Sequence, residues 1–346
     1  MRKRTHPGSN PDRLGTVMRL PIRIAHGLFD LLLATVALFT VVVYLPFPVA
    51  FLEWFCGNQI FRLGLMAVGI FLLLHYLTGA RRVVLGLALA VVMILAGEAF
   101  RDIPFGHHQP NRSAGGVCRV LTYNTNGSDV RTALDLLDSG AVDLGGFVEI
   151  RERRQDQGRY MVLELQRRGY YGIYQRMFPE AEFGILLASR SPWEEVQVVT
   201  APSLRDSVRS FLIARTEVKG RRVTVVALHL ESVGLGDEGI DKAGSWRSRY
   251  RQIEIIRQEL KRVKGPLIIL GDFNTTPTDR ILRMLKRGLA DAWRDGGSGL
   301  GVTWQHFFPI FRIDYILTRG FGEAVIARRI GSNSDHFALK AELFPN

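Results

Sequence analysis

The sequence predicts a membrane anchor of three helices followed by a soluble domain that mixes α-helices with β-strands. Two observations support this division. The first hundred residues contain three long apolar stretches, whereas the rest of the chain contains short apolar runs that end in polar or acidic residues. Long apolar stretches suit a bilayer, and short runs bounded by Gly and Pro suit buried strands.

The apolar stretches cover residues 27–47, 61–77 and 83–96. With its interfacial ends, each approaches the ~20 residues that a helix needs to cross a bilayer. They lack a polar stripe, which argues against the alternative of three buried helices in a soluble bundle. The chain is therefore expected to divide into a basic cytoplasmic N-terminus (1–26), an anchor (27–100), a linker (101–116) and a soluble domain (117–346).

The distribution of basic residues predicts the orientation of the anchor. Six basic residues precede the first stretch, and Arg81 and Arg82 lie between the second and third, whereas residues 48–60 carry only Glu53. By the positive-inside rule the N-terminus is cytoplasmic, and the soluble domain faces the periplasm or the cell exterior. The expected location is thus the bacterial inner or plasma membrane. The first stretch begins too late for a cleavable signal peptide.

The two cysteines of the chain, Cys56 and Cys118, would both lie outside the cytoplasm and close to the membrane. An oxidising compartment permits a disulfide between them. Two unpaired apolar cysteines fit the sequence equally well.

Within the soluble domain, nine apolar runs are candidate strands: 118–124, 143–148, 183–188, 195–200, 209–216, 222–230, 266–270, 312–317 and 336–343. The longest helix is predicted over residues 245–263. The Gly-rich loops are expected to be mobile.

Polar residues that carry chemistry stand at the ends of these runs. Asp272 and Asn274 follow the run 266–270, and short polar side chains at i and i+2 can address a phosphate from one side. Ser334-Asp335-His336 precedes the last run, which places an acid and a titratable imidazole at one strand mouth. Other ends carry Asn124, Glu149 and His229, and Asp314 stands among apolar neighbours within the run 312–317.

Taken in order, these motifs resemble the endonuclease/exonuclease/phosphatase superfamily, with its deoxyribonuclease I-like fold, over roughly residues 117–345. The resemblance implies a four-layer α/β (α+β) sandwich of two mixed β-sheets flanked by helices. It also implies a metal-dependent phosphoesterase, here as a membrane-anchored bacterial-type member. In this family the catalytic residues gather at strand ends along one edge.

The same resemblance assigns metal and proton-transfer roles. Glu149 matches the principal metal ligand, with Asn124 beside it and Asp335 as a further ligand. His336 matches the catalytic histidine, and Asp314 matches the carboxylate that orients it. The implied cofactor is Mg²⁺, with Mn²⁺ as a substitute, because Mg²⁺ takes one or two carboxylates and leaves room for substrate oxygens.

Further matches concern the phosphate and the second histidine. Asp272 and Asn274 match the pair that positions the nucleophilic water and binds phosphate, and His229 matches a second catalytic histidine. Arg209 resembles a phosphate-contacting arginine. Glu182 is a candidate for supporting the second histidine. Asn126 stands where AP endonucleases usually carry Asp, which predicts weaker metal binding.

Charge and anchoring bear on the substrate. The chain has 45 basic and 33 acidic residues, which favours an anionic phosphate substrate. We expect a lipid-linked phosphate, either a phospholipid diester or a polyprenyl pyrophosphate, with the bilayer as partner and no protein partner implied. A tethered nuclease acting on nucleic acid is the alternative, and a catalytically silent binding module is a third.

Overall fold

The computed structural model describes Leu28 and residues 103–104, 116–127, 130–139, 141–151, 157–177, 182–202, 208–232, 242–304, 311–322, 326–330 and 334–344. Apart from Leu28, the three expected membrane spans lie outside these residues, as do Cys56 and most of the expected linker. No helix in the described ranges is long and apolar enough to cross a bilayer.

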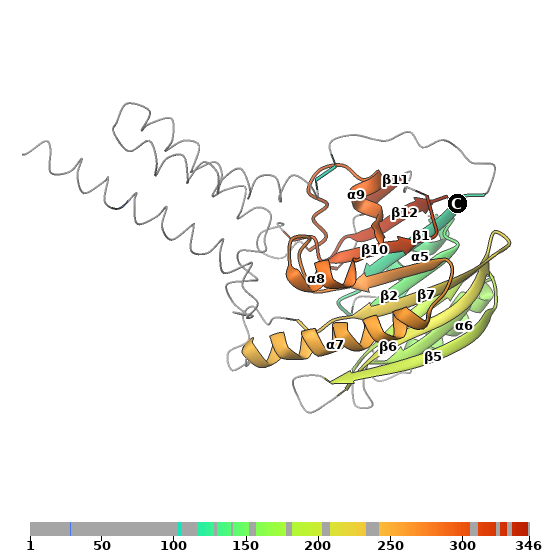
Figure 1. The fold of residues 1–346 in the computed structure, drawn as a ribbon. Helices are drawn as coiled ribbons and strands as arrows, with labels where there is room; N and C mark the ends of the chain where they lie inside the picture. Colours follow the sequence, from blue (N-terminus) through green and yellow to red (C-terminus); the bar gives the residue numbers. More distant parts are fainter. Residues whose placement is uncertain are drawn as a thin grey trace, which may run out of the picture.

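Twelve strands in the described ranges form two mixed sheets of six strands each (Figure 1). The first sheet has the order β11-β12-β1-β2-β4-β3 and comprises β1 (Cys118–Asn124), β2 (Leu144–Arg151), β3 (Tyr171–Arg176), β4 (Phe183–Ser189), β11 (Ile326–Ile330) and β12 (Ala338–Leu343). The second has the order β5-β6-β7-β8-β10-β9 and comprises β5 (Trp193–Pro202), β6 (Val208–Val218), β7 (Arg221–His229), β8 (Leu267–Asp272), β9 (Ala290–Asp291) and β10 (Asp314–Arg319).

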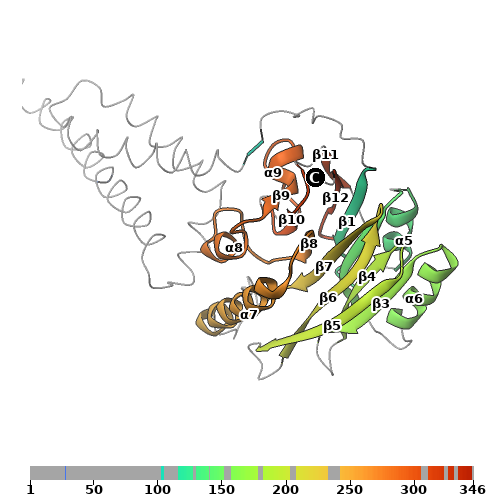
Figure 2. The same ribbon diagram turned by 45° about the vertical axis from the view of Figure 1, so that its right-hand side comes forward.

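Helices cover the outer faces of both sheets, as the two views in Figures 1 and 2 show. The helices are α5 (Val130–Ser139), α6 (Gln157–Arg167), α7 (Lys242–Arg262), α8 (Arg280–Leu285) and α9 (Ala292–Gly296). Apolar side chains of α5 and α6 pack on the first sheet, and those of α7 and α8 pack on the second. A third apolar cluster fills the space between the two sheets. The predicted sandwich of two mixed sheets flanked by helices is confirmed.

The topology brings the ends of four central strands to one edge of the sandwich. β1 and β2 are parallel neighbours in the first sheet, and β7 and β8 are parallel neighbours in the second. Parallel neighbours end on the same side, so the polar residues that follow these strands lie together.

The first of the expected linker residues already contact the domain. Ile103 is buried, and the carbonyl oxygen of Pro104 accepts a hydrogen bond of 3.1 Å from the backbone N–H of Gly299. Residues 101–116 were expected to form a free linker. Because Pro104 already contacts the domain, the free part of this linker ends before residue 103.

Candidate active site

Three candidate site residues, His229, Asp272 and Asp314, lie side by side on neighbouring strands of the second sheet. In the ladder, His229 at the end of β7 is paired with Asp272 at the end of β8, and Asp272 is paired with Asp314 at the start of β10. Gly271 makes this close approach possible. Its φ is +134°, and a Cβ there would lie 1.9 Å from the carbonyl oxygen of Leu228. Only glycine fits this position without rearrangement.

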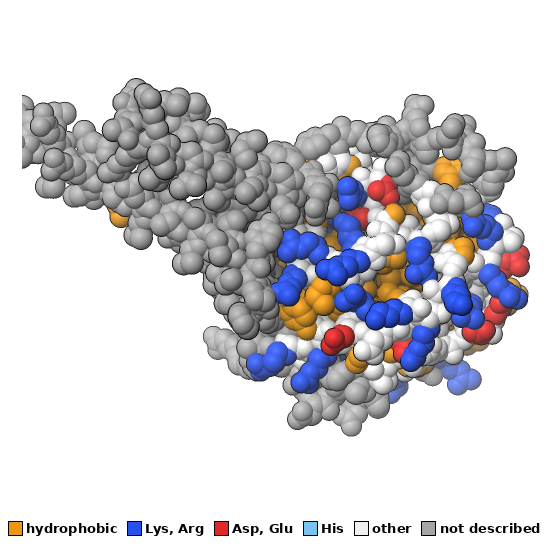
Figure 3. Space-filling model, viewed as in Figure 1, with side chains coloured by type: hydrophobic (Ala, Val, Ile, Leu, Met, Phe, Trp, Pro, Cys, Tyr) orange, Lys and Arg blue, Asp and Glu red, His pale blue; other side chains and the backbone are white. Residues whose placement is uncertain are grey.

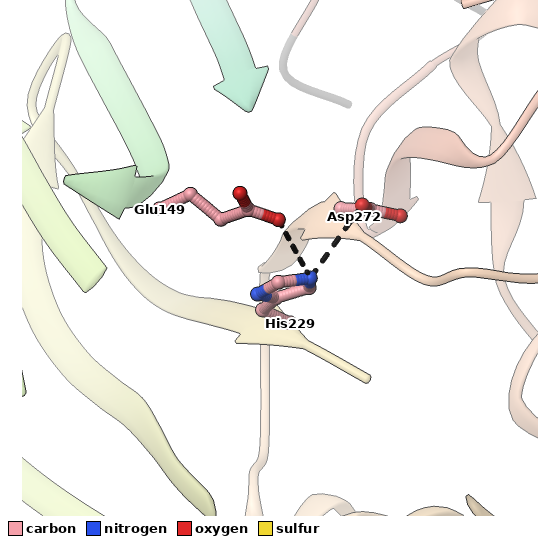
Figure 4. Close-up of side chains that lie close together, drawn as sticks. All are labelled: Glu149, His229 and Asp272. Atoms are coloured by element: carbon pink, nitrogen blue, oxygen red, sulfur yellow. Dashed lines mark ion pairs between the residues drawn. The ribbon is translucent and has the colours of Figure 1, made fainter. Parts of the chain in front are cut away.

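Asp272 Oδ2 is the centre of the site. It accepts a hydrogen bond of 3.0 Å from Asn124 Nδ2 on the first sheet. It also lies 3.6 Å from His229 Nε2 and 3.9 Å from His336 Nε2. Figure 4 shows His229 pointing its ring toward both Glu149 and Asp272, with Glu149 Oε1 3.5 Å from Nε2. Side chains from both sheets thus converge on one carboxylate.

A β-bulge directs Glu149 into this cluster. The register between β2 and β4 shifts between Phe147 and Ile150, and Glu149 has a φ of +56°, which is unusual for a residue with a side chain. The local strain is held by Thr125, whose Oγ1 donates a hydrogen bond of 2.7 Å to the Glu149 carbonyl. The Glu149 side chain also accepts a hydrogen bond of 3.0 Å from Asn124 Nδ2.

His336 and Asp314 form a buried pair. His336 Nδ1 is 2.8 Å from Asp314 Oδ2, a distance that fixes the orientation of the ring and leaves Nε2 facing the cluster. Asp314 is fixed in turn, because its backbone N–H donates a hydrogen bond of 3.1 Å to Thr303 Oγ1. Asp314 Oδ1 is buried and has no hydrogen-bond partner within the described part of the chain.

The neighbouring charges and burial shift the pKa values of His336 and Asp272. Burial alone would lower the pKa of His336, but the charge and hydrogen bond of Asp314 and the charge of Asp272 outweigh it and raise that pKa to about 10. Burial, with the nearby charge of Asp314, raises the pKa of Asp272 to about 7. At neutral pH His336 therefore carries its proton, while Asp272 is poised to gain or lose one.

The remaining two members respond mainly to burial. The pKa of Glu149 is raised by desolvation, and the charge of Asp335 adds to this effect. The pKa of His229 lies well below its usual range, because burial and the charges of Arg209 and His336 oppose protonation. Burial thus favours the neutral imidazole of His229 and opposes the negative charge of Glu149.

Two overlapping groups of side chains have the spacing of metal ligands. In the first, Glu149, His229 and Asp272 place ligand atoms within 4.8 Å of one another, and in the second Asp272, Asp314 and His336 do so. Carboxylate oxygens are the ligands that hard divalent cations prefer, and a neutral imidazole suits transition metals. The first group fits a divalent cation better, since the second already contains a cationic imidazole paired with its carboxylate.

Two of the expected metal ligands have other contacts. Asn124 points its amide nitrogen at Glu149 and Asp272, while its Oδ1 accepts a hydrogen bond of 2.9 Å from the backbone N–H of Asn126. In this orientation Asn124 bridges the two carboxylates as a donor. Asp335 accepts a hydrogen bond of 3.1 Å from Trp304 Nε1 and belongs to neither metal-ligand group of the described residues.

Asn274 is held beside Asp272 by its backbone and its side chain. Its N–H donates a hydrogen bond of 2.8 Å to Asp272 Oδ1, and its Nδ2 donates one of 2.9 Å to the Leu230 carbonyl. Its φ is +46°, and the fully buried Arg249 donates a hydrogen bond of 2.7 Å to its carbonyl oxygen. α7 thus supports the turn that follows β8.

Arg209 and Glu182 differ in how close the structure brings them to the site. Arg209 Nη1 donates hydrogen bonds to the carbonyl oxygens of His229 and Leu230, at 3.3 and 3.4 Å, and its Nε is 3.3 Å from Glu231 Oε2. Arg209 therefore braces the end of β7. Glu182 immediately precedes β4 and is exposed, whereas His229 is buried. The carboxylates that face His229 are instead Glu149 and Asp272.

Two supporting residues carried no motif in the sequence. Thr303 accepts backbone hydrogen bonds from Ile313 and Asp314, and Trp304 fixes Asp335 and forms an isolated β-bridge with His336. Both follow the Gly-rich segment 296–301, whose composition predicts a mobile loop. The sequence offered one hint, the short run Val302-Thr303-Trp304 directly after those glycines.

The comparisons with known proteins agree with this geometry. The sequence matches the model of the Endonuclease/Exonuclease/phosphatase family over residues 121–336. None of the curated proteins matches the chain.

Solved structures share the fold at low sequence identity. A humanised TDP2 from D. rerio has a TM-score of 0.52 and 18% identity, over 66% of this chain and 98% of that one. A 3′ phosphatase from Neisseria, solved with a product DNA hairpin, has a TM-score of 0.50 and 21% identity, over 65% and 98%. A family protein from Bacteroides vulgatus has a TM-score of 0.54 and 16% identity, over 67% and 100%.

The family model covers more than half of the chain and spans every strand end that contributes to the cluster around Asp272, from Asn124 to His336. The chain therefore belongs to the endonuclease/exonuclease/phosphatase family.

Proposed function

We propose that this protein is a divalent-metal-dependent phosphoester hydrolase. The observation that carries the proposal is the convergence on Asp272 Oδ2, where side chains from both sheets come within 3.9 Å of one oxygen atom. Around this carboxylate, His336 has a raised pKa and His229 a lowered one. A purely structural ion pair needs no such arrangement of two histidines. Hydrolysis of an anionic ester does need charge neutralisation and proton transfer at one point.

Glu149 and Asp272 are the residues that would hold the cation, with His229 at the same position. The spacing of their ligand atoms and the two carboxylates fit Mg²⁺, and the imidazole makes Mn²⁺ an acceptable substitute. A bound cation would supply charge neutralisation of the phosphate and a lower pKa for a bound water.

The chain's own groups divide the remaining work. His336, protonated and oriented by Asp314, places positive charge and a proton donor at Nε2, where it can stabilise the phosphate oxygens. Asp272 is suited to orient the attacking water, because Asn124 and Asn274 hold its two carboxylate oxygens in place. The backbone N–H of Asn274 fixes Asp272. Neutral His229 lies on the other side of Asp272, with its Nε2 facing Glu149 and Asp272.

For the substrate we propose a lipid-linked phosphate, with the enzyme anchored by the three apolar stretches and the catalytic domain outside the cytoplasm. Anchoring supports this proposal, because a tethered enzyme meets a membrane-bound substrate in two dimensions. The alternative is a tethered nuclease. In its favour are the surplus of 45 basic over 33 acidic residues and a structural neighbour solved with DNA.

The test is a side-by-side assay of the detergent-solubilised full-length protein with Mg²⁺. The substrates are a polyprenyl pyrophosphate, a phospholipid and plasmid DNA, and His336→Ala is the blank. We expect lipid turnover that His336→Ala abolishes, with plasmid left intact. Plasmid nicking with inert lipids would establish the nuclease instead. Inactivity on all three substrates with Mg²⁺ and with Mn²⁺ would contradict the hydrolase proposal.

A further inference from the structure

The expected tether between membrane and domain is short. The third apolar stretch ends at residue 96. Ile103 is already buried, and the carbonyl oxygen of Pro104 accepts a hydrogen bond from the backbone N–H of Gly299 in the domain. Seven residues extend over at most about 25 Å. A domain attached through residues 103–104 would therefore hold that side close to the bilayer surface.

The attachment point is connected to the active site. Gly299 also accepts a hydrogen bond of 3.0 Å from Trp293 Nε1 of α9. The same segment continues to Trp304, which fixes Asp335. In Figures 1 and 2 the short coloured piece at residues 103–104 lies beside α9, on the side of the molecule that also carries α8. Residues 103–104 thus lie on the side of the described domain that carries the segment leading to Trp304.

This side is basic. Residues 280–290 include four basic residues and no acidic one, and α8 packs beside α7. Figure 3 shows Lys and Arg side chains spread over the face that these helices cover. We define the basic face by the exposed or half-buried arginines of α7, α8, α9 and the turn after α8: Arg247, Arg251, Arg280, Arg283, Arg287 and Arg294. The acidic residues on the exposed parts of the same helices are Glu254, Glu259 and Asp295.

Resting on the proposed membrane anchoring, we propose that the basic face binds anionic phospholipid headgroups of the bilayer that holds the anchor. Basic residues close to a bilayer surface are attracted to anionic lipids within about one Debye length. Half-buried Met284 and Leu289 lie among these arginines, whereas residues 280–290 contain no aromatic side chain. Single-stranded nucleic acid is usually bound by several aromatic stacking platforms. The described part of α7 adds one half-buried aromatic side chain, Tyr250 beside Arg251, so the segment 280–290 is the part of the face that favours a lipid surface. Binding in this way brings the strand ends of the active site near the headgroup phosphates.

The experiment uses the full-length protein in nanodiscs of phosphatidylcholine, with or without phosphatidylglycerol. Hydrogen–deuterium exchange is measured by mass spectrometry over peptides of residues 247–294. We expect slower exchange in the anionic nanodiscs only, reversed by high salt and lost in Arg283→Gln/Arg287→Gln. The matched control Arg215→Gln/Arg222→Gln removes two arginines from β6 and β7, both paired with glutamates on β5, and is expected to keep the protection.

Equal exchange in both lipid compositions, or undiminished protection in Arg283→Gln/Arg287→Gln, would overturn the proposal. So would protection by an added oligonucleotide that anionic lipid does not reproduce. Turnover of bis(p-nitrophenyl) phosphate by the same samples separates the two proposals. Turnover without lipid-dependent protection rejects the surface and keeps the hydrolase, and protection without turnover does the reverse.

Discussion

Asp272 is the residue on which the account depends, and its position was predictable while its environment was not. The motif Gly271-Asp272-Phe273-Asn274 after a buried run predicted a polar pair at a strand mouth. The sequence could not show that Asn124 turns its amide nitrogen toward Asp272. Side-chain orientation depends on contacts between segments far apart in the chain, and the same limit applies to exposed Glu182. Nor could the sequence show the acidity of His336: burial opposes its protonation, but the charge and hydrogen bond of Asp314 raise its pKa to about 10.

At the residue scale we predict that Asp314→Asn lowers the pKa of His336 and reduces kcat by about a hundredfold or more. The sign follows from the charge of Asp314, which favours the imidazolium form. The pKa is read from an NMR titration of the His336 ring, assigned by comparison with His336→Ala. Asp138→Asn, which removes an exposed carboxylate paired with Arg168, is the control. An unchanged His336 titration would contradict the pairing.

At the scale of elements, two irregularities place the site residues. The β2 bulge turns Glu149 inward, and Gly271 allows β8 to approach β7. The sequence predicted the runs that form these strands but not the bulge, since a single residue of register is set by pairing with β4. It also missed β3, β9 and β11 and the shorter helices α5, α6, α8 and α9, whose patterns are brief. The longest helix, predicted over residues 245–263, is present as Lys242–Arg262.

We predict that Gly271→Ala destabilises the protein by about 3 kcal/mol or more, because the new Cβ meets the Leu228 carbonyl and the backbone is left in a strained conformation. Gly220→Ala provides a matched control. It also has a positive φ, +75°, but nothing lies within 4 Å of the new Cβ, so its cost is limited to about 1–2 kcal/mol. Thermal unfolding of both variants measures the difference. Equal loss of stability in the two would show that the contact with β7 is unimportant.

A buried ion pair joins α9 to the segment that leads into β10. Asp291 accepts hydrogen bonds of 2.9 and 2.8 Å from Arg312 and caps α9 at Trp293. Burial opposes ionisation of Asp291, but Arg312 and Lys286 outweigh it and lower the pKa of this carboxyl. Arg312 lies two residues before Asp314, so this ion pair also supports the contact between Asp314 and His336.

We predict that Asp291→Asn destabilises the protein at pH 7 by about 3–5 kcal/mol, since it leaves Arg312 buried without its charge partner. A carboxylate with a lowered pKa contributes stability above its ordinary pKa of about 4, and that contribution disappears as the pH falls. The acid sensitivity of denaturant unfolding should therefore be weaker in the variant. Glu194→Gln, at an exposed pair with Arg222, should cost less than ~1 kcal/mol. Similar costs for both variants would contradict the account.

At the scale of the whole molecule, the order of strand-end motifs predicted the architecture, because those motifs resemble a known family. All nine predicted strands are present, with ends shifted by a few residues where pairing extends or shortens a run. Apart from Leu28, the three predicted spans lie outside the described residues and remain a prediction. Of the two alternatives for the cysteines, the structure shows Cys118 as a free thiol among the described residues, and Cys56 lies outside them. Cys118 is buried between the sheets, where desolvation raises the pKa of its thiol to about 12.

The most direct measurement of the central claim is phosphodiester hydrolysis by the full-length protein with Mg²⁺, with EDTA, and after replacement of single site residues. The account predicts turnover that needs the cation and that falls by at least about a hundredfold in Glu149→Gln and in His336→Ala, while thermal unfolding shows both variants folded. Wild-type rates in both folded variants, or full activity in EDTA, would place the chemistry outside the cluster around Asp272.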